Sequence, residues 1–128
     1  MSQIIYKNES YFVIGLCMDI HNQLGKGFSE AVYSDALEIE LKSNGVPFRK
    51  EAKFDINYKG EKLKHHYYAD YLIDDKIILE LKAVSKISDS HIKQTLNYLA
   101  ASKIELGLIV NFGEDSLAYK RVILQSNS

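Results

Sequence analysis

The sequence has little of several features that define other classes of protein. It contains one cysteine, Cys17, which excludes a disulfide framework and a cysteine-based zinc site. Its single proline, Pro47, and seven glycines act as local turn signals, and no repeat, low-complexity tract or linker divides the chain. No apolar run approaches the roughly 20 residues that span a bilayer. We therefore expect a single domain over residues 1–128, with no membrane span.

The cysteine and the N-terminal segment both bear on location. Cys17 lies among Ile14, Met18 and His21 at helical spacing, which indicates a buried free thiol typical of a reducing compartment. The first residues, "MSQIIYKNESYF", lack a basic segment followed by a long apolar one, so we expect no signal peptide. Together these features predict a cytoplasmic protein.

The charge balance limits the kinds of partner. The net charge is −1, which excludes strong overall attraction to nucleic acid, so any such binding has to come from a local patch. A content of 46% hydrophobic and 26% charged residues is typical of a globular protein, and 128 residues are enough to bury a core.

Apolar periodicity predicts eight elements in the order α-α-β-β-β-α-β-β, a mixed α/β sandwich. The expected helices and strands occupy residues 9–24, 29–44, 52–58, 62–73, 76–83, 89–102, 105–112 and 119–125, before a frayed tail at 126–128. The inward stripes of the first two helices comprise Val13, Ile14, Cys17, Met18, His21 and Leu24, then Val32, Tyr33, Ala36 and Leu37. The nearly continuous apolar run at 105–112 predicts a strand covered on both faces.

Strand alternation predicts the register of the hairpin formed by residues 62–83. Ala69, Tyr71 and Ile73 share one face of the first strand, and the apolar face of the second strand matches them only across a three-residue loop at 74–76. That register places Asp70 opposite Glu80. Opposed carboxylates repel each other, so a cation should lie between them.

Two interpretations of this carboxylate pair remain open from the pattern alone. In the first, Lys82, two residues beyond Glu80 on the same face, forms a buried ion pair with Glu80 beside a partly exposed Asp70. Alternatively, a hard divalent cation would bind the carboxylate oxygens and keep several waters.

The spacing of Asp70, Glu80 and Lys82 resembles the catalytic signature of the PD-(D/E)XK nuclease superfamily. Upstream, "GFSEAVY" at residues 27–33 fits the motif of the GxxExxY protein family, which is placed in that superfamily. The resemblance covers residues 10–124 and includes a Gln-x-x-x-Tyr helix. It implies a restriction-endonuclease-like core, a mixed central β-sheet flanked by helices.

The resemblance also implies a function and the residues that perform it. It implies a nuclease that uses Mg²⁺ or Mn²⁺ to hydrolyse phosphodiester bonds in DNA, with RNA as the other substrate. Metal ligands would be the carboxylates of Asp70, Glu80 and Glu30 and the carbonyl of Leu81, and Lys82 would position the attacking water. The resemblance adds Gln94 to the active site and pairs it with Tyr98. Helical spacing puts Tyr33 on the same face as Glu30, and His91 on the same stripe as Gln94 and Tyr98, so Tyr33, His91 and Tyr98 are candidates for contact with the substrate or for support of the site residues.

Less specific interpretations stand beside these roles. Glu30 and Gln94 are equally consistent with solvated helix positions, Tyr33 with the core, and His21 with packing. The stretch at 59–66, with its lysines and His65–His66, fits either a basic edge for a phosphate backbone or a solvated strand face.

The sequence departs from the superfamily pattern in two ways. Ala69 stands where the signature has proline, and no DNA-binding appendage is evident. A catalytically inactive nuclease-fold domain that binds nucleic acid or a protein partner is therefore the alternative function. A homodimer or a partner protein that supplies substrate contacts fits the resemblance as well.

Overall fold

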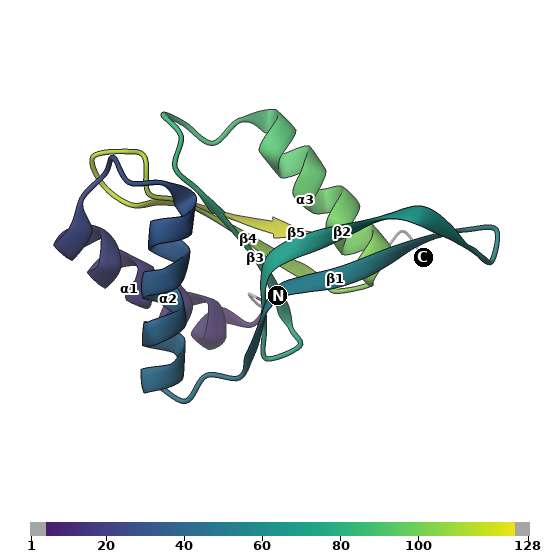
Figure 1. Ribbon diagram of the computed structural model, residues 1–128, viewed down its shortest axis with the longest axis horizontal. Helices are drawn as coiled ribbons and strands as arrows, with labels where there is room; N and C mark the ends of the chain where they lie inside the picture. The colour runs from purple at the N-terminus through teal and green to yellow at the C-terminus, as the bar shows by residue number, and fades with distance from the viewer. Residues whose placement is uncertain (1–4, 125–128) are drawn as a thin grey trace, which may run out of the picture.

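The expected order of eight elements is confirmed by a computed structural model, which describes residues 5–124 (Figure 1). The elements are α1 (Lys7–Leu24), α2 (Glu30–Ser43), β1 (Phe48–Tyr58), β2 (Glu61–Ile73), β3 (Ile77–Lys82), α3 (Asp89–Ser102), β4 (Leu106–Asn111) and β5 (Ala118–Ile123). The tail expected at 126–128 and the last residue of the final expected strand lie outside the described residues. Within residues 5–124, no helix is long and apolar enough to cross a bilayer.

The five strands form one mixed sheet in the order β1-β2-β3-β4-β5. Neighbouring strands are antiparallel except β3 and β4, which are parallel and are connected through α3. The helices α1 and α2 cover one face of this sheet and α3 covers the other (Figure 1). Every residue of β4 is buried, so the strand expected to be covered on both faces is confirmed.

Two hydrophobic clusters fill the space on either side of the sheet. The larger lies under α1 and α2, and the smaller lies under α3. Three residues expected in the inward stripes, Met18, Leu24 and Val32, are exposed instead. The buried side of α1 includes Leu16 and Ile20 because this helix packs against α2 as well as the sheet.

The hairpin register predicted for β2 and β3 is confirmed. Tyr71 pairs with Leu79 and Ile73 with Ile77, across the three-residue loop at 74–76. Asp74 and Asp75 adopt the left-handed conformation, with φ of 51° and 55°, which short-chain acidic residues tolerate better than most. The amide of Lys76 donates to the Ile73 carbonyl and closes the loop at 2.9 Å.

The strand β1 changes direction at Glu51, where φ is 53°. The ladder with β2 therefore skips this residue: Lys50 pairs with Tyr71 and Ala52 pairs with Ala69. Tyr71 belongs to the cluster under α2, whereas Ala69 belongs to the cluster under α3. The expectation that Ala69 shares a face with Tyr71 was wrong. The backbone is irregular at Glu51 and Asp70, so the side chains before and after this point do not follow one alternation.

Candidate active site

The strands β2 and β3 separate beyond the pair Tyr71–Leu79, and two carboxylates take over their hydrogen bonding. The amide of Asp70 donates to Oε2 of Glu80 at 2.9 Å. The amide of Leu81 donates to Oδ2 of Asp70 at 2.8 Å. The carboxylates thus meet at the point of divergence, where the predicted register brings them together.

Glu80 lies in an environment that disfavours its charged form. Its side chain is buried, and the pKa of its carboxyl is raised to about 8, mainly by burial and then by the charge of Asp70. The hydrogen bond from the Asp70 amide and the charge of Lys82 lower the pKa, but these effects are smaller. The protonated form of Glu80 is therefore favoured at neutral pH.

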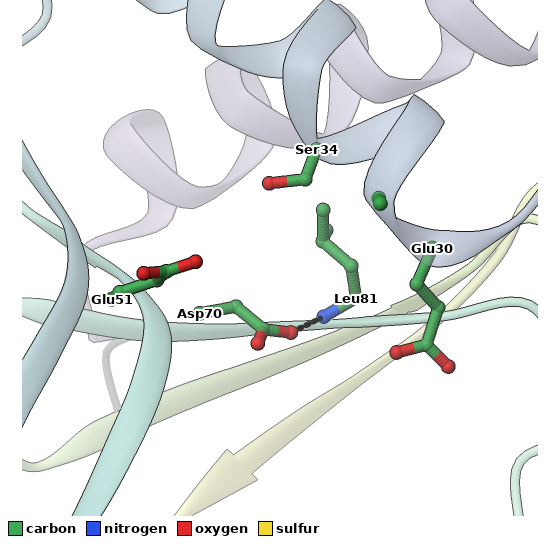
Figure 2. Close-up of a pocket in the computed structure, with 6 residues that line it drawn as sticks. Glu30, Ser34, Glu51, Asp70 and Leu81 are labelled. Atoms are coloured by element: carbon green, nitrogen blue, oxygen red, sulfur yellow. Dashed lines mark hydrogen bonds between the residues drawn. The ribbon is translucent and has the colours of Figure 1, made fainter.

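A pocket of about 130 Å³ opens on the α2 side of Asp70. Its walls come from α2, β1, β2 and β3 and consist of Glu30, Ala31, Ser34, Glu51, Asp70 and Leu81. Figure 2 shows Glu51 and Glu30 on either side of Asp70, with the Asp70 carboxylate bonded to the Leu81 amide. Three acidic side chains from three separate elements therefore surround one opening.

Tyr33 holds the loop that delivers Glu30 to this pocket. Its hydroxyl donates to the Gly25 carbonyl at 2.5 Å and accepts from the Phe28 amide at 3.3 Å. Its ring is buried and stacks on Phe112 with centroids 4.3 Å apart. These contacts support a positioning role, because they restrain the chain just before α2, which begins at Glu30.

On the other face of the sheet, α3 brings Tyr98 toward the carboxylates. Its ring stacks on Tyr67 at 4.0 Å and 3°. The pKa of Tyr98 is raised by burial and by the charges of Glu80 and Asp70, which reflects their proximity. Gln94 lies one turn earlier on α3 and is exposed.

His91 takes part in the N-terminal cap of α3. Its Nδ1 accepts from the Ser88 amide at 3.0 Å, and its own amide donates to the Ser88 hydroxyl at 3.3 Å. The two bonds form a capping box. His21, on α1, is buried and bonds through Nε2 to the Glu114 carbonyl at 2.8 Å, which agrees with a packing role.

Lys82 ends β3 and is half-buried. Across residues 5–124, no ion pair within 4.0 Å joins its Nζ to a carboxylate. The interpretation of a plain Glu80–Lys82 ion-pair cluster therefore lacks its defining contact. Lys82 acts on Glu80 at longer range, since its charge lowers the pKa of that carboxyl.

This fold and site can be compared with known proteins. A family model of the PD-(D/E)XK nuclease superfamily matches residues 7–122. The chain belongs to this superfamily. No protein among those with curated descriptions matches the sequence.

Solved structures that resemble this PD-(D/E)XK chain include the following two. The crystal structure of SSO0001 superposes with a TM-score of 0.60 at 23% identity, over 76% of this chain and 52% of that one. An alkaline exonuclease from Laribacter hongkongensis gives 0.55 at 14% identity, over 98% and 73%. The present chain thus spans about half the length of SSO0001. At these identities the likeness concerns the fold, and the expected restriction-endonuclease-like core is confirmed.

Two residues at or near this candidate site were not predicted from the sequence. Glu51 reaches the pocket only because β1 turns at a positive φ, which no sequence signal announces. Asn111 is fully buried and had a signal: it is an amide inside the apolar run "LGLIVNF", where a polar side chain needs partners.

Asn111 joins the segments that follow β3 and β4. Its Oδ1 accepts from the amides of Val84 and Gly113, each at 3.0 Å, and its Nδ2 donates to the Val84 carbonyl and to Oε2 of Glu114, each at 2.9 Å. The clamp restrains the chain two residues beyond Lys82, so it holds the end of β3 that carries Glu80 and Lys82.

The donor atoms around the pocket suit a hard divalent cation. Carboxylates from Glu30, Glu51 and Asp70 are oxygen ligands, which Mg²⁺ and Mn²⁺ prefer. Over residues 5–124, no group of three or more His, Cys, Asp or Glu side chains lies close enough together to hold a metal ion by itself. A cation at this pocket would have to take most of its ligands from water and substrate, as Mg²⁺ often does.

Proposed function

We propose that this protein is a nuclease that uses Mg²⁺ or Mn²⁺ to hydrolyse phosphodiester bonds in DNA, with RNA as the other candidate substrate. The contact of Asp70 with Glu80, beside an acidic pocket, carries the proposal. The Gly-x-x-Glu-x-x-Tyr motif at 27–33 supports membership of the GxxExxY group within the superfamily. The buried Cys17 thiol supports a cytoplasmic location.

Asp70 is the central ligand in this proposal because it faces both the pocket and Glu80. Glu30 and Glu51 would complete the metal's protein ligands from the pocket side, and the Leu81 carbonyl and Glu80 from the strand side. A bound cation of this kind lowers the pKa of water and stabilises charge on the phosphorus centre. It would also replace the proton that Glu80 otherwise retains.

The lysine and the α3 residues would act around that centre. Lys82 carries a positive charge at the end of β3, where it offsets phosphate charge and orients the attacking water. Tyr98 and Gln94 share one side of α3 and would contact the substrate from the face opposite the pocket. Tyr33 would act indirectly, by holding the start of α2 and with it Glu30.

The deciding experiment is a cleavage assay with purified protein on single-stranded, duplex and branched DNA and on RNA, in Mg²⁺ or Mn²⁺. We expect Glu80→Gln and Lys82→Ala each to lower the cleavage rate about a hundredfold or more. Glu80→Gln removes a negative carboxylate and Lys82→Ala removes a positive charge from the proposed reaction centre. The exposed residues Glu105 and Lys120 provide matched controls, and Glu105→Gln and Lys120→Ala should keep full activity. Cleavage that survives both site substitutions would overturn the assignment.

One observation favours the alternative, a nuclease-fold domain without catalysis that binds nucleic acid, a protein or a second copy of this chain. Each carboxylate of the pair accepts a hydrogen bond from a backbone amide of the other strand, at the point where β2 and β3 separate. Both carboxylates therefore stabilise the fold without a metal. This alternative predicts no turnover with any substrate and unchanged nucleic-acid binding in Asp70→Asn.

A further inference from the structure

The outer parts of β1 and β2 form a two-stranded arm, residues 53–68, that extends beyond the helices (Figure 1). The strand β2 pairs with β3 only over Tyr71–Ile73, so the rest of β2 has β1 as its single ladder neighbour. The turn at its tip has positive φ at both Lys59 and Gly60, as a two-residue hairpin loop in a type I′ turn requires. The arm is thus a β-hairpin with a tight turn, and its ladder has an irregularity between Asp55 and Asn57.

The two faces of the arm differ in their surroundings. One face packs toward α3, where Phe54 stacks on Tyr67 at 5.2 Å and Tyr67 stacks on Tyr98. Adjacent strand residues point to opposite faces, so Lys53 and Tyr68 point away from α3. We call this second face, with Lys53, His66 and Tyr68, the outer face of the arm; Lys64 follows two residues from His66, where the ladder is irregular.

The outer face exposes aromatic rings. Tyr68 is 55% exposed although it lies in the middle of a strand. His66, also exposed, meets the Tyr68 ring edge-on, with centroids 5.2 Å apart and an angle of 84°. The edge contact restrains the tyrosine and leaves part of its ring open to solvent, which is the arrangement of a stacking platform.

The arm also concentrates positive charge in a chain whose net charge is −1. It has four lysines and two acidic residues, Asp55 and Glu61. Lys62 pairs with Asp55 at 3.4 Å, so the acidic side chain on this face is compensated. Lys53 and Lys64 form no ion pair with any described residue and are available to an anion.

The outer face leads directly to the acidic pocket. Lys53 pairs with Tyr68 in the ladder. Two residues further along the same strands come Glu51 and Asp70, which both line the pocket. Two residues of a strand span about 7 Å, so a polymer lying on the outer face reaches the carboxylates without leaving the surface.

We propose that the outer face of the arm binds a single-stranded segment of nucleic acid and directs it into the pocket. An unpaired base stacks on Tyr68, and Lys53 and Lys64 bind the phosphates. A duplex fits less well because its base faces are covered by their neighbours. The inference rests on the proposed function for the nature of the polymer, and it assigns a nucleic-acid-binding appendage, which was not evident in the sequence.

Fluorescence anisotropy in EDTA tests this inference without cleavage, with a labelled single-stranded oligonucleotide and its duplex. We expect tighter binding of the single strand and a loss of roughly fivefold to a hundredfold in Tyr68→Ala, whereas Tyr68→Phe keeps the stacking ring and the affinity. Lys53→Ala and Lys64→Ala should each reduce the slope of log affinity against log salt by about 0.7. Lys120→Ala, on the opposite edge of the sheet, should leave the single-strand affinity and its salt dependence unchanged.

The outcomes separate this inference from the proposed function. Unchanged single-strand affinity in Tyr68→Ala, or tighter binding of the duplex, would overturn the arm inference even if Glu80→Gln abolishes cleavage. Binding that depends on Tyr68, in a protein that cleaves nothing, would support the arm and overturn the nuclease. All arm variants should retain the unfolding temperature of the parent because the substituted side chains lie on the surface, and a circular-dichroism melt verifies this.

Discussion

Asp70 and Glu80 are held together by a crossed pair of hydrogen bonds, in which the Asp70 amide donates to Glu80 and the neighbouring Leu81 amide donates to Asp70. The contact joins β2 to β3 where their ladder has ended. It places two carboxylates in contact in a largely buried position, which is costly unless a proton or a cation compensates. Both compensations lead to predictions.

The first prediction concerns stability without metal. The pKa of Glu80 is raised in the fold from an ordinary 4.5 to about 8, so between these values the folded chain binds more protons than the unfolded chain. This group's contribution is fully present below about pH 4.5 and is lost as pH rises through 8. In EDTA, urea unfolding should show the free energy of unfolding falling from pH 5 to pH 8, on the order of 3 kcal/mol from this group.

Glu80→Gln is neutral throughout and should flatten that dependence. The exposed residue Glu105 supplies the control, and Glu105→Gln should follow the parent curve. Equal slopes in the parent and Glu80→Gln would show that the buried carboxyl is already ionised at neutral pH.

The second prediction concerns metal addition. A cation that takes the place of the proton should stabilise the folded protein at pH 8, by about 2.7 kcal/mol at a hundred times its dissociation constant. Asp70→Asn should lose most of this gain because it removes the central ligand. Asp75→Asn, in the exposed loop at the far end of β2, should keep it. Thermal melts with and without Mg²⁺ measure the difference, and an equal gain in both variants would refute a site at Asp70.

The third prediction concerns Tyr33. Tyr33→Phe keeps the ring on Phe112 but loses the hydroxyl bonds to Gly25 and Phe28. We expect a cost of about 1–3 kcal/mol and faster amide hydrogen exchange at Phe28. Tyr58→Phe is the comparison, since Tyr58 is 60% exposed and its substitution should change neither quantity. Undisturbed exchange at Phe28 would argue against a positioning role for the hydroxyl.

The fourth prediction concerns the clamp beyond β3. A Cβ added at Gly113 would lie 2.2 Å from the Val84 carbonyl oxygen, so Gly113→Ala must displace backbone and disturb the Asn111 hydrogen bonds. We expect it to destabilise the protein by roughly 1–3 kcal/mol in urea unfolding. Gly15→Ala, at a helical position with nothing within 4 Å, should instead stabilise by about 0.5–1 kcal/mol. Opposite signs for the two substitutions are the result that verifies the close approach.

Local patterning was enough to predict the element order and the hairpin register. Both depend on short-range properties, since apolar alternation assigns each face and one register matches those faces across the loop at 74–76. For the same reason the contact between Asp70 and Glu80 followed from the sequence. The spacing that resembles the superfamily signature describes the same hairpin.

Tertiary structure alone decided which other side chains join that pair. Glu51 enters the pocket because a positive φ redirects β1, and Glu30 enters because α2 lies over the split strands. The same redirection moves Ala69 to the α3 side and turns Tyr68 outward on the arm. Strand alternation determined which charged side chains lie opposite each other within one hairpin. Backbone bends and helix packing determined which side chains surround them. Bends and packing depend on contacts between segments far apart in the chain, so the local pattern does not specify them.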